Sequence, residues 1–107
     1  MRFIVFWEWD PDDWDTIVAR RNKLRAWRDQ LPKAEREKRD KQQRQLLPGH
    51  YIGGQSKGLT VIETDDPKRL AELWLSYYPE MRMKLVPIFP VEETIEQRED
   101  IRRKKGI

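Results

Sequence analysis

The sequence predicts one α+β domain whose elements follow the order strand, helix, strand, strand, helix, strand. Three observations lead to this order: an aromatic and β-branched first segment, two helix starts marked by aspartate followed by proline, and a glycine-bounded pair of short apolar segments. The length of 107 residues is close to the usual size of a single domain. Five tryptophans in a chain that is 38% charged indicate an apolar core inside a very polar surface, rather than a disordered chain.

The first strand is predicted over Arg2–Trp9, where β-branched and aromatic residues cluster before Asp10-Pro11 ends the run. Both of its faces are apolar. The odd positions carry phenylalanine, valine and tryptophan, and the even positions carry isoleucine and phenylalanine, with Glu8 the one interruption before the turn. A strand with two apolar faces needs cover on both sides of its sheet.

Two amphipathic helices are predicted after the two aspartate-proline pairs. The first begins at Asp10-Pro11 and keeps apolar residues at helical spacing up to Pro32, which should end or kink it. Arginines dilute its apolar stripe towards the C-terminal end. The second helix begins at Asp66-Pro67 and is stopped by Pro79.

Residues 33–45 form a charged insertion, which we expect to be a solvated helical extension because it holds good helix formers and one apolar residue. Between residues 33 and 44, six lysines and arginines stand against three acids, so the segment carries a net charge of +3, equal to that of the whole chain. A concentrated basic helix could bind nucleic acid through phosphate contacts. A solvated helix with alternating charges explains the segment equally well.

Three further strands complete the predicted sheet. Leu46–Gly54 is typical of a turn followed by a short strand, and Leu59–Thr64 and Met81–Val91 are typical of strands. Pro87 favours an edge position for the last strand, because proline cannot donate to the hydrogen-bond ladder. The tail, residues 92–107, is acidic first and basic last, an order that suits the dipole of a helix.

Over residues 1–91, two right-handed β-α-β units of this length close into a four-stranded antiparallel sheet with both helices on one face. This arrangement is ferredoxin-like. The other sheet face is then uncovered, and the first strand predicts that it is apolar. Exposed apolar patches usually mark an interface, and back-to-back packing of two sheets is the simplest cover. We therefore expect a homodimer.

Three segments resemble the dimeric α/β-barrel group of ferredoxin-like proteins, and most closely a small uncharacterised family: FIVFWEW, the YIGG–KGLTVIETDD hairpin and KLVPIFPV. The charged insertion departs from that family's pattern. The resemblance implies a two-fold dimer with a pocket between each sheet and its helices, or inside the joint barrel. The wider group includes cofactor-free monooxygenases, haem-degrading enzymes, isomerases and ligand-sensing regulatory domains, and the fold alone does not choose among them.

Glu8 and Glu63 are the leading candidates for chemistry, because both lie late in predicted neighbouring strands on otherwise apolar faces. Two carboxylates facing one cavity would raise the pKa of one of them and supply a general acid or base. Alternatively, each reaches solvent at a strand end and pairs with an arginine. His50 could transfer protons at the cavity mouth or, from two subunits, hold a metal or haem, whereas an exposed loop histidine would do neither.

Four aromatic residues are weaker candidates for ligand binding: Trp7, Trp9, Tyr51 and Trp27. Aromatic residues at strand and helix spacing more often form plain core. Trp27 is the exception, because it lies off the apolar stripe of its helix and could contact a ligand or a partner subunit.

The sequence lacks the residues that several kinds of site require. The chain has no cysteine and one histidine, so disulfides, thiolate metal sites and a closed zinc site within one subunit are excluded. No cofactor motif and no serine nucleophile elbow is present. No apolar run approaches the roughly 20 residues that cross a bilayer, and no secretory leader is visible, so we expect a cytoplasmic protein without a membrane partner.

These observations lead to a homodimeric small-molecule-binding or regulatory domain as the first hypothesis for function, and they leave open whether it is an enzyme. The second hypothesis is a cofactor-free or haem-handling enzyme that uses Glu8, Glu63 and His50. The third is a nucleic-acid-associated protein acting through the basic segment 33–44.

Overall fold

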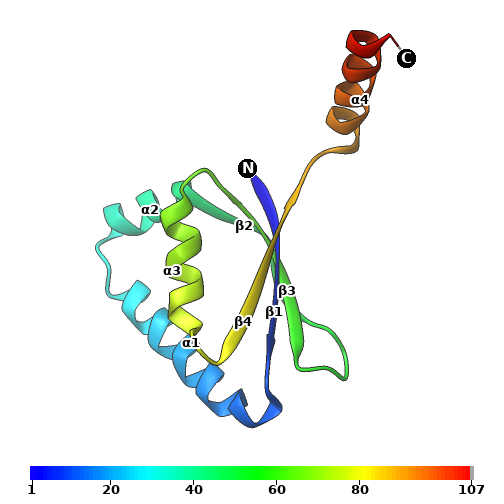
Figure 1. Cartoon of the computed structure of the whole chain (residues 1–107). Coiled ribbons are helices and arrows are strands. Elements are labelled where there is room, and N and C mark those ends of the chain that lie inside the picture. Colours follow the sequence, from blue (N-terminus) through cyan, green and yellow to red (C-terminus); the bar gives the residue numbers. More distant parts are fainter. Residues whose placement is uncertain (107) are drawn as a thin grey trace.

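The computed structural model describes residues 1–106, and it is an α+β fold with a four-stranded antiparallel sheet and four α-helices (Figure 1). The strands are β1 (Arg2–Trp9), β2 (Gln43–Tyr51), β3 (Lys57–Thr64) and β4 (Met81–Ile88). The helices are α1 (Trp14–Asp29), α2 (Lys33–Gln42), α3 (Pro67–Tyr77) and α4 (Val91–Lys105), and a 3-10 turn over Pro11–Asp13 leads into α1. The α+β prediction is confirmed. The predicted element order is matched only in part, because α2 and α4 are additional to it.

Both aspartate-proline pairs begin helical segments, as predicted. The Asp10 carboxylate accepts a hydrogen bond from the backbone N–H of Asp12 at 3.3 Å, and Asp66 accepts one from that of Lys68 at 3.0 Å. These bonds satisfy N–H groups that the first turn of a helix leaves without partners. At Asp10 the first turn is a 3-10 turn, so the α-helix itself begins only at Trp14.

The segment around Gln43 corrects two predicted boundaries. Helix α2 ends at Gln42, not at Gln45, and β2 therefore begins three residues before the predicted Leu46. The polar residues of this stretch become strand because β3 pairs with them: the Gln45 side-chain amide donates to the Thr60 hydroxyl at 3.1 Å. An edge strand tolerates such polar residues, since much of its length faces solvent.

Strand β4 is shorter than predicted, because it ends at Ile88 just before Phe89-Pro90. It lies at the edge of the sheet, whose order is β2-β3-β1-β4. The edge position predicted from Pro87 is therefore confirmed. Residues that face each other in the register share one side of the sheet, so the pairing of β1 with both neighbours assigns the paired residues of β1, β3 and β4 to a face. In β2 only the residues paired with β3 are assigned in this way, because its register shifts on both sides of Leu47.

One face of the sheet is covered by α1 and α3, and it carries the core. Trp9 of β1 pairs with Met81 of β4, and both pack on Ile17 of α1. Tyr77 of α3 packs against this cluster, and burial raises the pKa of its hydroxyl above the usual value, while nearby arginines of α1 act in the opposite direction. The buried core is small: its apolar members are Val5, Trp9, Ile17, Ile62 and Met81.

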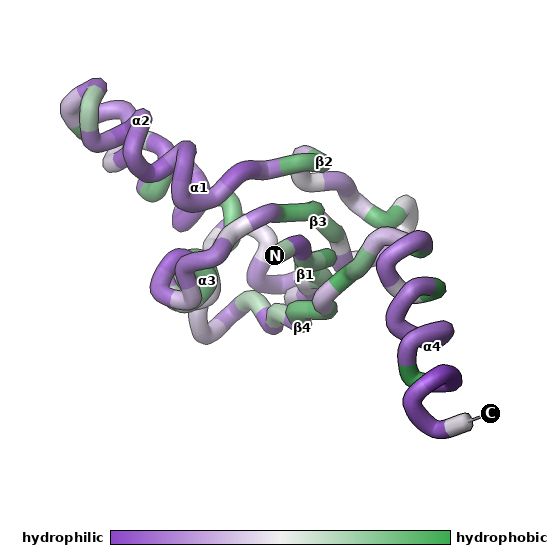
Figure 2. The backbone as a smooth tube through the Cα atoms, turned by 90° about the horizontal axis from the view of Figure 1, so that it is seen from above, coloured by the Kyte–Doolittle hydropathy of each residue, from purple (hydrophilic) through white to green (hydrophobic). Residues whose placement is uncertain are grey.

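The opposite sheet face has no helix over it, and we call it the open face. Most of its middle is apolar, with side chains that are half-buried or exposed, as the register and the burial of each strand show: Ile4, Phe6, Leu47, Leu59, Val61, Val86 and Ile88. Lys84 of β4, which faces Phe6, lies on the same face and is exposed. Seen from above, α1, α2 and α3 lie on one side of the sheet and α4 on the other (Figure 2). The expectation of an apolar, uncovered sheet face is confirmed for residues 1–106.

Helix α4 stands clear of the sheet beyond the end of β4 (Figure 1), and none of its residues is buried. Acidic residues occupy its first turn and basic residues its last, as the helix dipole favours, and Gly106 ends it in the left-handed conformation with φ 70°. The Cα radius of gyration is 17.6 Å, against about 13 Å for a compact domain of this length. The single chain is therefore extended rather than closed on itself. No helix within residues 1–106 is both long and apolar enough to cross a membrane.

Candidate functional site

A cleft of about 340 Å³ lies at the end of the sheet where β1 finishes. Its lining combines apolar side chains with charged ones from three adjacent strands and the turn after β2: Phe6, Trp7, Glu8, Ile52, Lys57, Gly58, Arg82, Met83 and Lys84. Two of the sequence candidates, Trp7 and Glu8, are among these residues. Three cations and one carboxylate give the lining a net positive charge.

Glu8 occupies the centre of an ion triad in this cleft. Its carboxylate lies 3.1 Å from Arg82 Nε and 3.8 Å from Lys57 Nζ, the residues that face it on β4 and β3. The Glu8 side chain is 43% exposed, so water screens these contacts. Glu8 therefore pairs with an arginine and a lysine near the end of its strand, which agrees with the alternative that the sequence left beside a catalytic role.

Glu63 is at the far end of the same sheet face. It faces Arg2 in the register and accepts a hydrogen bond from Arg2 Nε at 2.8 Å. This bond and the positive charge of Arg2 hold the pKa of the Glu63 carboxyl below its usual value. A lowered pKa favours a permanent carboxylate, whereas a general acid at neutral pH needs a raised one.

The structure does not bring Glu8 and Glu63 to one cavity within a single chain. Glu8 lies six positions along β1 from Arg2, the partner of Glu63, which corresponds to about 20 Å along a strand. His50 is exposed on β2, its ring contacts the carbonyl of Pro48, and it does not line the cleft around Glu8. The three predicted catalytic candidates are thus at three separate places in the monomer.

Two glycines leave the space that the Trp7 indole ring occupies. A Cβ on Gly58, the residue that faces Trp7 on β3, would lie 2.8 Å from Trp7 Cε2 and 2.8 Å from the carbonyl oxygen of His50. A Cβ on Gly49 would lie 3.1 Å from Trp7 Cη2. Glycine at both positions therefore makes room for the indole ring. Sequence reasoning identified Trp7 but not this pairing, because the register of β3 and the path of β2 create it.

Trp9 and Tyr51 belong to an aromatic cluster rather than to the cleft. The Trp9 ring lies 5.5 Å from that of Trp14 and 5.7 Å from that of Tyr51, and Trp14 and Tyr51 are 5.3 Å apart. Such centroid distances are typical of stabilising aromatic pairs. The cluster connects the start of α1 with the end of β2, which is a packing role.

Trp27 is exposed on α1, and the Arg39 guanidinium of α2 lies over its ring at 4.7 Å from the centroid. Arg39 also pairs with Glu72 of α3 at 2.7 Å. Trp27, Arg39 and Glu72 therefore connect three helices, and the Arg39 guanidinium covers one face of the Trp27 ring. Another cation of the basic segment, Lys33, lies 3.9 Å from Glu37 of the same helix.

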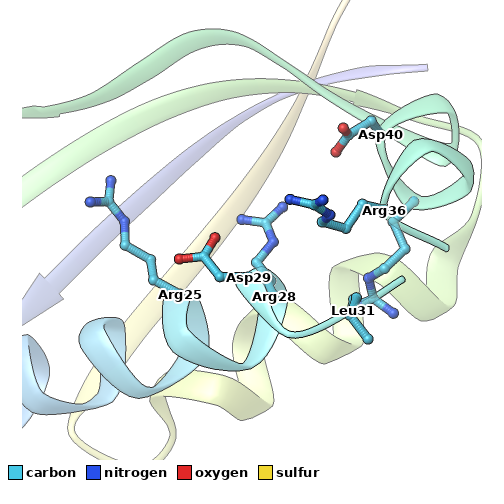
Figure 3. Close-up of a pocket in the computed structure, with 7 residues that line it drawn as sticks. Arg25, Arg28, Asp29, Leu31, Arg36 and Asp40 are labelled. Carbon is cyan, nitrogen blue, oxygen red and sulfur yellow. The ribbon is translucent and has the colours of Figure 1, made fainter. Parts of the chain in front are cut away.

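A second cleft, of about 430 Å³, lies between α1 and α2 and was not predicted (Figure 3). Arginines from both helices line it together with two aspartates and one leucine: Arg25, Arg28, Asp29, Leu31, Arg36, Arg39 and Asp40. The sequence did contain a signal for this cleft, namely the arginines in the second half of α1. From the sequence alone they are interpreted only as polar residues that interrupt the apolar stripe of the helix. The turn at Pro32 directs α2 back towards α1, and this places Arg36 beside the arginines of α1 around one cleft.

Within residues 1–106, no three histidine, cysteine, aspartate or glutamate side chains come together in a way that could hold a metal ion. Arg20 of α1 and Glu80 make the most shielded ion pair, at 2.8 Å, and it ties α1 to the start of β4. The charged residues that line the two clefts are mainly cations.

Comparison with protein families matches residues 1–100 to a domain of unknown function, DUF3303. The matched span runs through α2 and into α4. No curated protein and no solved structure matches the chain. Because the family match covers nearly the whole length, the chain belongs to the DUF3303 family.

Proposed function

We propose that this protein is a homodimeric, small-molecule-binding domain with a regulatory role, in which the open faces of two ferredoxin-like subunits pack together as a dimeric α/β barrel. The observation that carries the proposal is the open face itself. Its apolar middle has no cover within residues 1–106, while the other face is packed against α1 and α3. The sheet order β2-β3-β1-β4, with its two main helices on one side, supports the ferredoxin-like arrangement.

The accessible surface of the chain supports a missing partner. It measures 8357 Å², whereas a folded monomer of 13.1 kDa exposes about 6,400 Å² by the usual scaling with mass. The difference is larger than the roughly 800 Å² that each partner buries in a standard interface. The extended shape and the small core have the same explanation, because the second half of the core is then formed between two sheets.

The ends of the open face are suited to a two-fold interface. Its apolar middle is bounded by the Arg2–Glu63 pair at one end and by Glu8 with Lys57 and Arg82 at the other. A hydrophobic centre with a charged, solvent-accessible rim is the usual anatomy of a stable interface. The rim also limits how two copies can slide past each other, because burying its charges costs free energy. Lys84 lies between the two ends, facing Phe6 on the edge strand β4, so its long side chain has to reach the border of the interface.

The cleft at the Glu8 end is the proposed ligand site. Its volume lies at the low end of the range for small-molecule pockets. Phe6 supplies apolar surface on the same sheet face as Glu8 and Lys84, whereas Trp7 and Met83, which also line the cleft, belong to the opposite face. Lys84 forms no ion pair within residues 1–106, whereas Lys57 and Arg82 are engaged by Glu8. The ligand best suited to this lining has a flat apolar body and one carboxylate or similar anionic group. No observation favours the enzyme hypothesis over this one.

The first experiment is the mass in solution, measured by light scattering behind a sizing column. We expect about twice 13.1 kDa, because two open faces cover each other. A monomer at protein concentrations well above micromolar would contradict the dimer and the barrel together.

Binding at the Glu8 cleft can be tested with 2-naphthoate by isothermal titration calorimetry. We expect Lys84→Ala to weaken binding about tenfold, the usual size of a lost charge-assisted hydrogen bond, and Lys23→Ala, an equal loss of charge on the exposed side of α1, to leave it unchanged. If 2-naphthol binds as well as 2-naphthoate, or if neither binds, the cleft does not recognise an anionic ligand.

A further inference from the structure

The α1–α2 cleft holds arginines that have no partner in the chain. Arg25, Arg28 and Arg36 form no ion pair within residues 1–106, although Asp29 and Asp40 line the same cleft. Arg39, by contrast, is already bound to Glu72 and lies over Trp27. In Figure 3 the guanidinium groups of Arg28 and Arg36 point toward one another, with no carboxylate between them.

Two guanidinium groups that face each other repel, and an anion between them would remove that repulsion. Each guanidinium offers a planar pair of N–H donors, which matches two oxygens of a phosphate group. A single carboxylate could satisfy one arginine in this way, whereas a phosphate has enough oxygens for donors from two sides. The chemistry of the cleft therefore favours a phosphate group over a carboxylate.

We propose that the α1–α2 cleft binds a compact phosphate-bearing anion, held between Arg28 on α1 and Arg36 on α2, with Arg25 at its edge. Inorganic phosphate, pyrophosphate and the phosphate of a small metabolite share this chemistry. Binding joins α1 to α2 across the turn at Pro32, in addition to the contact of Arg39 with Trp27. The site does not depend on the proposed dimer, because α1 and α2 lie on the side of the sheet opposite the open face.

A nucleic acid is a less suitable occupant. Proteins that bind single-stranded nucleic acid without sequence preference combine a continuous basic groove with aromatic side chains that stack on bases. The one tryptophan near the cleft, Trp27, has Arg39 over its ring, and Asp29 and Asp40 interrupt the basic lining. The cleft thus offers a place for one concentrated anionic group rather than a track for a backbone.

The test is isothermal titration calorimetry of the full chain with pyrophosphate at low ionic strength, since salt screens such contacts. We expect saturable binding with one site per chain, and a loss of affinity of about tenfold or more in Arg28→Gln and in Arg36→Gln. Arg98→Gln on α4 is the matched control, because it removes the same charge far from the cleft, and it should bind as the unaltered protein does. Circular dichroism checks that each variant is folded, and all three positions are exposed on helices.

Three outcomes would overturn the proposal. One is the absence of saturable binding of phosphate or pyrophosphate, and another is an equal loss of affinity in the Arg98→Gln control. The third is tighter binding of a thymidine oligonucleotide than of pyrophosphate, dependent on the same two arginines, which would make the cleft part of a nucleic-acid surface. An inorganic phosphate that binds as tightly as pyrophosphate supports a site for a single phosphate group.

Discussion

Replacing Val61 with lysine is expected to turn the proposed dimer into a monomer. Val61 lies in the middle of the open face, opposite Ile4 on β1 and Leu47 on β2. Packing a second sheet on this position would bury an ammonium group without a partner, which costs several kcal/mol. Because each 1.4 kcal/mol is a factor of ten, the dimer dissociation constant should rise about a hundredfold or more. Light scattering over a range of protein concentrations measures this change.

The matched control for Val61→Lys is Leu75→Lys. Leu75 is an exposed apolar residue on α3, outside the open face, so introducing the same lysine charge there should leave the mass unaltered. Both variants should keep their secondary structure, since neither residue belongs to the buried core. A Val61→Lys protein that keeps twice the chain mass would show that the copies meet through another surface.

Replacing Trp9 with alanine is expected to cost about 3–5 kcal/mol of unfolding free energy, the usual cost of truncating a buried aromatic residue. Trp9 is 5% exposed, packs on Ile17 and Met81, and its ring meets those of Trp14 and Tyr51. Domains have only about 5–15 kcal/mol of stability in total. The loss is especially severe here, because the core contains so few fully buried side chains.

Urea unfolding followed by circular dichroism measures the effect of Trp9→Ala, at one fixed protein concentration because dimer stability depends on it. The control is Trp74→Ala, where a tryptophan that is 43% exposed meets the ring of Tyr78 at 5.1 Å. Removing it should cost about 1 kcal/mol. Should Trp9→Ala fail to fold, Trp9→Phe should still lose more stability than Trp74→Ala. Equal losses at positions 9 and 74 would contradict the assignment of the core.

The strands and helices that the sequence predicted best are those with a strong local signal. The bounds of β1 match the prediction, because its apolar residues end sharply at Asp10-Pro11. The start of α3 matches for a similar reason: aspartate caps the helix and proline suits its first position. The predicted start of β2 was wrong, because residues Gln43–Gln45 have no local preference for strand and become part of the strand only through pairing with β3.

The candidate sites depended more on the fold than on local sequence. Glu8 and Glu63 lie on one sheet face, but the antiparallel register of β1 and β3 places them at opposite ends, each beside a cation. The catalytic role that the sequence suggested for them therefore stays a prediction, with no convergence in the monomer to support it. The α1–α2 cleft escaped prediction because its arginines come from two helices, and the turn at Pro32 decides that they meet.

The sequence by itself determined that this protein is an α+β domain whose sheet has two apolar faces, of which its two amphipathic helices can cover only one. That information is local, because the side chains of a strand alternate between two faces whatever the strand pairs with. Only the tertiary structure decided which charges become partners, that Gly58 makes room for Trp7, and that arginines of α1 and α2 line one cleft. Those relationships join residues far apart in the chain, and pairing register and helix packing, rather than local propensity, set the distances between them.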